Sequence, residues 1–343
     1  MKEPFRARRL LLPLIPLYQL ALAFRDLLLL MGLEPVRRLR FPVISIGNLS
    51  TGGSGKTPLA IALARALAGR GLRVDVLSRG YGRRSPLAAR VKPDGSAADF
   101  GDEPLLIGRE TGLPVYVASQ RYDAGRLAET AAAKTNEENP KPLVHLLDDG
   151  FQHRQLAREV NILLLNLHDW QDWLLPAGNL REPLAAVRRA SVIAIPADEP
   201  ELETELRAWG WQGPLWRLHR AMEIPAVEGP VAAFCGIARP EQFFAGLEAA
   251  GVTLAARFAF PDHFTYTGAV LEELLATARE KGATAIVTTE KDLVRLGSLA
   301  SIFPKSLPLA TAKLHIEIED QDAAIDWLVD RVTPGTSISG IRF

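Results

Sequence analysis

The 343-residue chain has a single cysteine, Cys235, and no net charge, because 40 basic residues balance 40 acidic ones. One cysteine excludes an intrachain disulfide and a thiolate metal cluster, and it fits a reducing compartment. The balanced charge provides no basic field, so nucleic acid is not an expected partner and any anion must be bound locally. The six histidines show no close zinc spacing.

Internal repeats and low-complexity tracts are absent as well. Hydrophobic residues make up 48% of the chain and charged residues 23%, which is ordinary globular usage. A chain of this size buries roughly 75% of its unfolded surface. The composition therefore predicts a folded chain of one large or two ordinary domains.

The N-terminal segment lacks a charge-free apolar run of about 20 residues, the length that crosses a membrane. Residues 10–32 come nearest, but Arg25 and Asp26 interrupt them, and Pro13 and Pro16 disfavour a helical start. Three alternatives remain: a buried helix, a cleaved secretory signal, or a helix at a membrane surface whose arginines meet anionic lipid. The basic residues before the apolar run are Lys2, Arg6, Arg8 and Arg9.

The sequence does contain a glycine-rich stretch, SIGNLSTGGSGKTP, at residues 45–58. Its glycines let backbone N–H groups face phosphate oxygens, Lys56 can reach the terminal phosphates, and Thr57 can ligate magnesium. The general pattern has glycine where this chain has Ser50, so the match is a variant. A plain glycine turn is the alternative, and it is disfavoured because the helix N-terminus that follows is itself an anion site. The predicted nucleotide contacts are Ser50, Gly52, Gly53, Ser54, Gly55, Lys56 and Thr57.

A second polar cluster follows an apolar strand in HLLDDGFQH, which ends in Asp148 and Asp149. A sheet that binds a nucleotide places a magnesium-binding acid at this position. The alternative is that the two acids cap the next helix. Asp148 leaves the strand first, so it is the preferred ligand, directly or through water.

Three loops carry further polar residues: SRGYGR (residues 78–83), GDEP (residues 101–104) and LRE (residues 180–182). A parallel sheet builds its cleft outside the carboxyl ends of its strands, where these loops are expected. Each loop alone is a weak signal, because such residues are often simply solvated, and a lone His263 is by default surface or core filling. The residues by themselves predict a magnesium-dependent nucleotide enzyme and no more.

The order of strands and helices predicts an α/β fold, with a P-loop NTPase-like parallel sheet covered by helices on both faces. A second strand and helix begin near residue 230 and predict a smaller α/β domain, joined by two extended segments that pair as a linker. The predicted units are the N-terminal membrane-interface helix (1–33), the P-loop domain (34–215), the two-stranded linker (216–228 and 310–318), the smaller domain (229–309), and the C-terminal helix and tail (319–343).

Eight segments in order resemble the family of tetraacyldisaccharide 4′-kinases, the lipid A 4′-kinases. They are GNLSTGGSGKTP, LSRGYGR, GDEP, DDGFQH, PAGNLREP, AFCGIARPEQFF, FPDHF and VTTEKD. The resemblance runs from the N-terminal apolar helix to about residue 295, and Ser50 is no departure from this family. It implies transfer of the ATP γ-phosphate to the 4′-hydroxyl of tetraacyldisaccharide 1-phosphate, which forms lipid IVA.

The same resemblance implies the roles of individual residues. Asp102 matches the catalytic aspartate and is expected to act as base, His263 is expected to assist it, and Arg181 faces the charge that develops on the transferred group. The metal set is Thr57, Asp148, Asp149 and Glu182. The expected substrate contacts are Arg79, Tyr81, Arg83 and Asn179.

The expected cofactors are ATP and Mg²⁺, and the expected partners are the lipid substrate and the membrane surface, with no obligate protein partner. This places the chain at the cytoplasmic face of the bacterial inner membrane, peripheral or monotopic, where four acyl chains can stay in the bilayer. Two alternatives are a P-loop switch or ATPase that drives a partner, and a peripheral membrane-binding module whose enzyme site is vestigial. Against a GTPase switch, the Asn/Thr-Lys-x-Asp element is not found, because Lys291 stands directly beside Asp292.

Overall fold

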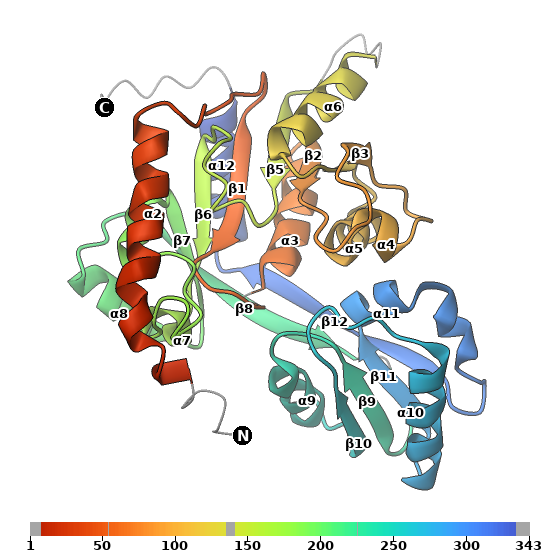
Figure 1. The fold of residues 1–343 in the computed structure, drawn as a ribbon. Helices are drawn as coiled ribbons and strands as arrows, with labels where there is room; N and C mark the ends of the chain where they lie inside the picture. The colour runs from red at the N-terminus through yellow and green to blue at the C-terminus, as the bar shows by residue number, and fades with distance from the viewer. Residues whose placement is uncertain (1–7, 54, 135–140, 225, 334–343) are drawn as a thin grey trace.

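The structure is a computed structural model that describes residues 8–53, 55–134, 141–224 and 226–333 (Figure 1). In this part of the chain a 12-stranded sheet has the order β10-β9-β11-β12-β8-β7-β6-β1-β5-β2-β4-β3. Ser54 and the chain ends, residues 1–7 and 334–343, lie outside the described residues.

The centre of the sheet is parallel. β1 (Val43–Asn48) lies between β5 (Leu143–Leu147) and β6 (Val160–Leu164), and β2 (Arg73–Ser78) and β7 (Val192–Pro196) extend the sheet on the two sides. All six residues of β1 are buried, as expected of a strand covered on both faces. The predicted parallel sheet is confirmed here, and β4 (Val115–Val117) and the antiparallel β3 (Ala89–Arg90) complete this edge.

Helices cover both faces of the sheet. Successive side chains of a strand point to opposite faces, so each strand contributes to the core under both layers of helices. Ile44 and Ile46 of β1 belong to the core under α3 (Lys56–Gly69), α5 (Asp102–Thr111) and α12 (Gln321–Val332). Val43 belongs to the core under α6 (Arg121–Ala133) on the opposite face. This arrangement confirms the predicted fold class. The other elements here are η1 (Leu12–Leu14), α2 (Ile15–Leu30), α4 (Ala97–Phe100), α7 (Leu167–Trp170), η2 (Leu184–Arg189) and α8 (Pro200–Ala208).

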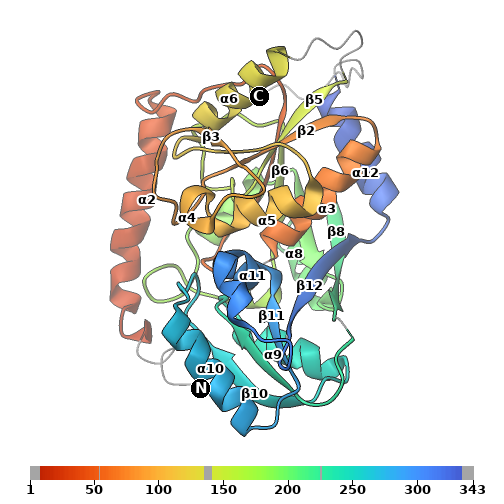
Figure 2. The same cartoon turned by 90° about the vertical axis from the view of Figure 1, so that its right-hand side faces the viewer.

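The sheet continues without a break into the second half of the chain (Figure 2). β8 (Leu215–Glu223) runs parallel to β7 and pairs antiparallel with β12 (Leu309–Ile318), for example at Leu218 and Ile318. Beyond β12 lie the parallel strands β11 (Ala285–Thr289), β9 (Val231–Cys235) and β10 (Leu254–Ala259). Helices α9 (Pro240–Ala249), α10 (Gly268–Glu280), α11 (Glu290–Leu296) and η3 (Gly297–Ile302) complete this half.

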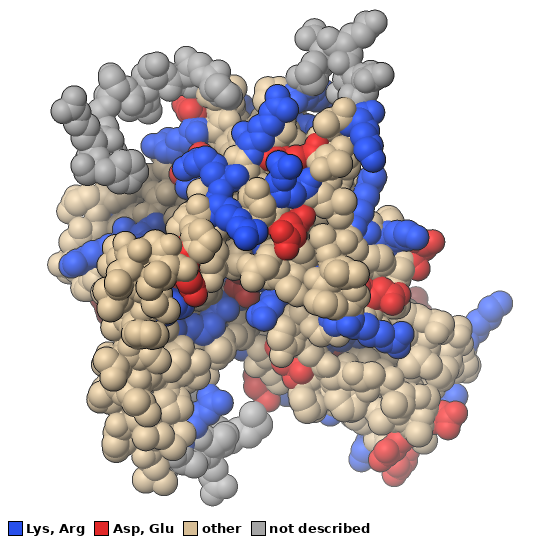
Figure 3. Space-filling model, turned by 45° about the horizontal axis from the view of Figure 1, so that its top comes forward, with Lys and Arg blue, Asp and Glu red and all other residues tan. Residues whose placement is uncertain are grey.

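The N-terminal helix α2 lies along the outside of the fold (Figure 1), and the face shown in Figure 3 is largely uncharged where this helix lies. No residue of α2 is fully buried, so the buried-helix alternative is wrong. Pro16 stands in the first turn, where proline fits a helix, so the expected obstacle to a helical start is absent. By length and composition alone, the 19 residues Leu12–Leu30 are long and apolar enough to cross a membrane.

Polar contacts tie α2 to the rest of the fold. The Tyr18 hydroxyl donates a hydrogen bond to the Arg181 carbonyl at 2.9 Å, and Arg25 pairs with Glu182 at 2.8 Å. Asp26 pairs with Arg154 at 2.5 Å. The charges that interrupt the apolar run therefore face the protein, and the apolar side chains remain outside.

Candidate functional site

The glycine loop, residues 49–55, joins the end of β1 to the start of α3. Gly52 and Gly55 have φ of 115° and 89°, a backbone region that other residues rarely adopt, so these two glycines are required by the turn. The first N–H groups of α3 have no partner within the helix and form an anion site. Lys56 Nζ lies 3.0 Å from Asn48 Oδ1 and 3.7 Å from Asp149 Oδ1, which holds its charge at the mouth of the loop.

Ser50 faces inward. Its hydroxyl donates to Asp169 Oδ2 at 2.9 Å and accepts from the Asn48 amide at 3.0 Å, and its side chain is buried. Arg239, at the start of α9, pairs with the other oxygen of Asp169 at 3.3 Å. Ser50 thus holds the glycine loop in shape rather than presenting its hydroxyl to a phosphate, and sequence reasoning missed its partner Asp169.

The two acids after β5 have opposite environments. Asp148 is 1% exposed, and neither of its carboxylate oxygens has a hydrogen-bond partner among the described residues. Burial, with Glu103 and Asp149 nearby, raises the pKa of Asp148 to about 8. Although burial opposes it, the charges of Lys56 and Arg181 hold the pKa of Asp149 well below its usual range.

A divalent cation fits beside Asp148, because a buried carboxylate without a partner is costly unless a ligand compensates it. Thr57 in the first turn of α3 supplies the second oxygen that such loops use. The carboxylate of Glu182 is 1% exposed and is already paired with Arg25 and Arg189, so its oxygens are less available to a cation than those of Asp148. The described residues contain no cluster of three or more His, Cys, Asp or Glu side chains that could hold a metal by themselves.

Asp102 and His263 meet, although 161 positions separate them in the chain. Asp102 is the first residue of α5, and its Oδ2 lies 3.1 Å from His263 Nδ1. Arg295 Nε donates to the same oxygen at 2.7 Å, and Lys291 Nζ lies 3.8 Å away. Burial raises the pKa of Asp102, but the hydrogen bond with His263 and the charges of Lys291 and Arg295 outweigh it and hold that pKa well below its usual range.

Sequence reasoning missed the two cations of α11. Lys291 pairs with Glu103 at 2.9 Å, and Arg295 pairs with Asp102 at 2.6 Å. The available signal was their spacing, because residues four apart in a helix share one face. The start of α11 also follows the end of a parallel strand, where functional side chains gather.

Arg181, the predicted catalytic arginine, lies against the ends of β1 and β5. Its guanidinium donates to Asn48 Oδ1 at 2.6 Å and to Asp149 Oδ1 at 3.1 Å. Arg121, which sequence reasoning missed, is 8% exposed. Burial and the neighbouring Arg79 lower the pKa of Arg121 to about 10.

The predicted substrate residues lie around this site in different states. Tyr81 is 60% exposed, and its ring centroid lies 5.0 Å from that of His263. Arg83 donates to the Leu87 carbonyl at 2.7 Å. Asn179 accepts from Arg8 at 2.9 Å and donates to Asp172 at 2.8 Å. Of the four, Arg83 and Asn179 are already bonded to neighbouring residues, and Tyr81 and Arg79 are exposed.

His153, in the same motif as Asp148, gives a pH prediction. Burial and the nearby charges of Arg121 and Arg158 lower the pKa of His153 to about 3. The unfolded chain takes up this proton near pH 6.5 and the folded chain does not, so the free energy of unfolding should fall as pH drops from about 6.5 toward 3. In His153→Gln that dependence should be shallower by about 1.4 kcal/mol per pH unit. Urea unfolding at several pH values measures how the free energy of unfolding changes with pH, and His315→Gln, at an exposed histidine, is the control. The same pH dependence in wild type and His153→Gln would contradict the assignment.

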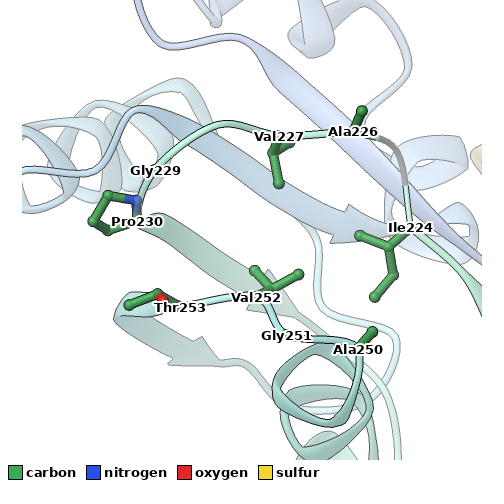
Figure 4. A pocket seen from close by; sticks show the side chains of 9 residues that line it. All are labelled: Ile224, Ala226, Val227, Gly229, Pro230, Ala250, Gly251, Val252 and Thr253. Atoms are coloured by element: carbon green, nitrogen blue, oxygen red, sulfur yellow. The ribbon is translucent and has the colours of Figure 1, made fainter.

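A separate hollow of about 420 Å³ lies at the amino end of β9, away from these residues (Figure 4). None of the described residues that line it is charged, so they offer no group that would bind a phosphate. The lining residues are Ile224, Ala226, Val227, Gly229, Pro230, Ala250, Gly251, Val252 and Thr253.

Comparison with known proteins gives one consistent family. A family model described as tetraacyldisaccharide-1-P 4′-kinase matches residues 7–333. A tetraacyldisaccharide 4′-kinase of Koribacter versatilis is 40% identical over 328 residues, covering 92% of this chain and 97% of that protein. One of Geobacter metallireducens is 38% identical over 310 residues, covering 83% and 87%. A crystal structure of LpxK from Aquifex aeolicus in complex with ATP matches with a TM-score of 0.73 at 32% identity, covering 95% of this chain and 100% of that one.

Proposed function

The chain belongs to the family of tetraacyldisaccharide-1-phosphate 4′-kinases, and we propose that it transfers the γ-phosphate of ATP to the 4′-hydroxyl of tetraacyldisaccharide 1-phosphate, forming lipid IVA in lipid A biosynthesis. The observation that carries this proposal is the pairing of Asp102 with His263 at 3.1 Å, next to Glu103, whose charge acts on Asp148. A nucleotide switch has no use for such a pair, whereas transfer to a sugar hydroxyl needs a group that takes its proton.

The nucleotide phosphates would lie on the glycine loop. The N–H groups at the start of α3 and the charge of Lys56 face that position, and Arg181 stands across from Lys56 on Asp149. Phosphoryl transfer is mostly positioning and charge stabilisation, which these fixed donors supply without reorganising. Mg²⁺ held by Asp148 and Thr57 would neutralise charge on the phosphates.

The surroundings of Asp102 support His263 as the proton acceptor in this proposal. A carboxylate with a lowered pKa and cations on its Oδ2 is a weak base. An imidazole hydrogen-bonded to an ionised carboxylate accepts a proton well, because the carboxylate orients the ring and stabilises its charged form. We therefore assign His263 as the base and Asp102 as the residue that orients it, in place of the reverse assignment made from sequence.

The sugar would enter beside Tyr81 and Arg79. Tyr81 is exposed and adjacent to His263, and a tyrosine face is a common platform for a sugar ring. Closing of residues 229–309 on the nucleotide about β8 and β12 belongs to the same proposal, because His263, Lys291 and Arg295 all come from that segment and meet Asp102 on α5.

Helix α2 would hold the protein at the cytoplasmic face of the inner membrane, where its apolar side chains enter the lipid and the acyl chains of the substrate stay in the bilayer. Its exposed apolar residues include Leu17, Leu20, Phe24 and Leu27, which are 49–67% exposed. The arginine and aspartate of this helix are already paired with the protein, which also argues against a signal that is cut away.

Exchanging Leu17, Leu20, Phe24 and Leu27 for glutamine should move the protein from the membrane fraction to the soluble fraction. Each buried apolar side chain contributes about 1.5–3 kcal/mol, so the four together should lower membrane binding at least a hundredfold. The exchange keeps Tyr18 and Arg25, whereas deletion of the helix would leave the buried Glu182 without Arg25. Sedimentation with vesicles measures the membrane-bound fraction, and Leu314→Gln on β12 is the control. An unchanged distribution of the fourfold variant would count against α2 as the anchor.

The proposed reaction is tested by transfer of labelled phosphate from ATP to tetraacyldisaccharide 1-phosphate in detergent micelles with Mg²⁺. Labelled lipid from wild type supports the kinase reaction. Hydrolysis of ATP without labelled lipid would instead favour an ATPase that drives a partner, the alternative from another class.

A further inference from the structure

We propose that Arg239 is a positioning residue for the nucleotide site, which sets the shape of the glycine loop from the second half of the chain through Asp169 and Ser50. The inference rests on the proposed function, since it concerns the ATP site of the same reaction. Arg239 belongs to the segment AFCGIARPEQFF, none of whose residues was expected at the site.

The ion pair of Arg239 and Asp169 links the two halves of the chain beside the glycine loop. Arg239 Nη2 donates to Asp169 Oδ1 at 3.3 Å, and 70 positions separate the two residues. The side chain of Asp169 is 0% exposed and that of Arg239 is 26% exposed. A buried carboxylate that loses its cationic partner is left with an uncompensated charge, which is strongly destabilising. The setting of Asp169 therefore depends on a cation from the other half of the chain.

Asp169 contacts the glycine loop through Ser50. Its Oδ2 accepts hydrogen bonds from the Ser50 hydroxyl at 2.9 Å and the Asn166 amide at 3.2 Å, and its own N–H donates to Asn166 Oδ1 at 2.8 Å. The Ser50 hydroxyl in turn accepts from the Asn48 amide at 3.0 Å. All four side chains are buried. In such a network the orientation of one group fixes that of the next, because a buried polar group left unpaired is costly.

Asn48 connects this network to the cations of the nucleotide site. Its Oδ1 accepts from Lys56 Nζ at 3.0 Å and from Arg181 Nη2 at 2.6 Å. An amide side chain has one donor end and one acceptor end, so the bond from its NH₂ group to Ser50 turns the oxygen toward the two cations. The orientation of Asp169 therefore bears on where Lys56 and Arg181 present their charges.

The second half of the chain also packs on the glycine loop next to Arg239. A Cβ placed on Gly52 would lie 3.5 Å from the Cβ of Ala238, and one placed on Gly53 would lie 3.8 Å from it. Ala238 therefore lies directly over the two glycines. The ion pair of Arg239 thus fixes both the turn that covers the loop and the carboxylate that shapes it.

The first test is binding of a non-hydrolysable ATP analogue with Mg²⁺, measured by titration calorimetry without lipid. Arg239→Met should raise the dissociation constant about tenfold, the lower end of what one hydrogen bond to a charged group contributes. Asp169→Asn keeps an acceptor for Ser50 but removes the charge that Arg239 holds, so it should raise the constant by a similar factor. The double variant should lose no more than the larger single change, because both substitutions remove one contact.

Two further variants serve as controls. Arg257→Met removes an arginine that pairs with Glu248 inside the second half of the chain, and it should keep the wild-type dissociation constant. Arg239→Lys keeps a positive charge for a single carboxylate oxygen, so it should stay within about threefold of wild type. Rescue by lysine separates the ion pair from simple packing of the arginine stem.

The second test is lipid phosphorylation at varied concentrations of both substrates. In Arg239→Met the KM for ATP should rise about tenfold while the KM for lipid stays at its wild-type value, because the glycine loop and Lys56 bind only the nucleotide. An equal change in both KM values, or a wild-type dissociation constant for the ATP analogue in folded Arg239→Met, would overturn the inference.

Losses that multiply in the double variant would also overturn it, because Arg239 would then act on the nucleotide without Asp169. If Arg239→Met does not fold, Asp169→Asn decides, and a wild-type dissociation constant in that variant would count against the inference. Absence of lipid labelling by a wild type that binds the ATP analogue would refute the proposed reaction alone, because the binding titration still tests Arg239.

Discussion

Lys56→Met should lower phosphoryl transfer about a thousandfold while the protein stays folded. Lys56 is the first residue of α3, and its ammonium lies at the mouth of the glycine loop, 3.0 Å from Asn48 and 3.7 Å from Asp149. Removal of one preorganised donor at a site of developing charge costs about 10²–10³ in rate, and loss of a full charge on the terminal phosphates should lie at the upper end. Initial rates of lipid labelling at saturating ATP measure the effect.

The matched control is Lys313→Met, which removes a lysine paired with Glu110 at 3.5 Å on β12. This variant should keep wild-type transfer, since its lysine is half-exposed and contacts no residue of the glycine loop. Thermal unfolding of both variants separates a catalytic loss from a folding defect. Transfer by folded Lys56→Met within tenfold of wild type would remove the glycine loop from the reaction.

His263→Gln should lower transfer by about 10²–10⁴, the usual contribution of a general base, and should leave ATP affinity unchanged. Asp102→Asn keeps a hydrogen-bonding group near His263 Nδ1 but removes the negative charge that stabilises the imidazolium, so we expect a smaller loss of about 10–10²-fold. The two act on one proton, so Asp102→Asn combined with His263→Gln should cost little more than His263→Gln alone.

His315→Gln is the matched histidine control, because His315 pairs with Glu223 on the exposed side of β12. Three measurements decide the assignment: kcat for lipid, the dissociation constant of ATP, and the coupling in the double variant. Losses that multiply, or a larger loss in Asp102→Asn than in His263→Gln, would restore Asp102 as the acceptor that sequence reasoning assigned.

The parts of the site that could be predicted are those encoded by contiguous segments. The glycine loop needs a strand, glycines at the two left-handed positions and a helix, and residues 43–69 supply all three locally. Asp148 follows β5 at the edge of the sheet where α3 begins, because parallel strands place their carboxyl ends together. Short hydrophobic runs that alternate with segments of helical periodicity were therefore enough to predict the fold class and one side of the site.

The sequence could not predict side-chain direction or partner. Ser50 belongs to the loop sequence, yet its hydroxyl points to Asp169. Glu182 stands next to Arg181 in the chain, yet its carboxylate turns to Arg25 on α2 and Arg189. The side chains of neighbouring residues in an extended loop point in opposite directions. A sequence motif therefore shows which residues are present but not which way each side chain points.

The sequence by itself determined the parallel α/β sheet, the glycine loop and the acids at the strand ends, because these follow from local backbone preferences and hydrophobic periodicity. The family resemblance already joined His263 to Asp102, but only the tertiary structure decided that Lys291 and Arg295 hold Asp102 as well. These three partners lie 161 to 193 positions from Asp102 along the chain. Those contacts depend on the strand order, which brings β11 and α11 next to α5, and on packing that removes water from the ion pairs. The same surroundings fix the charge of Asp102, and with it which residue can take the proton.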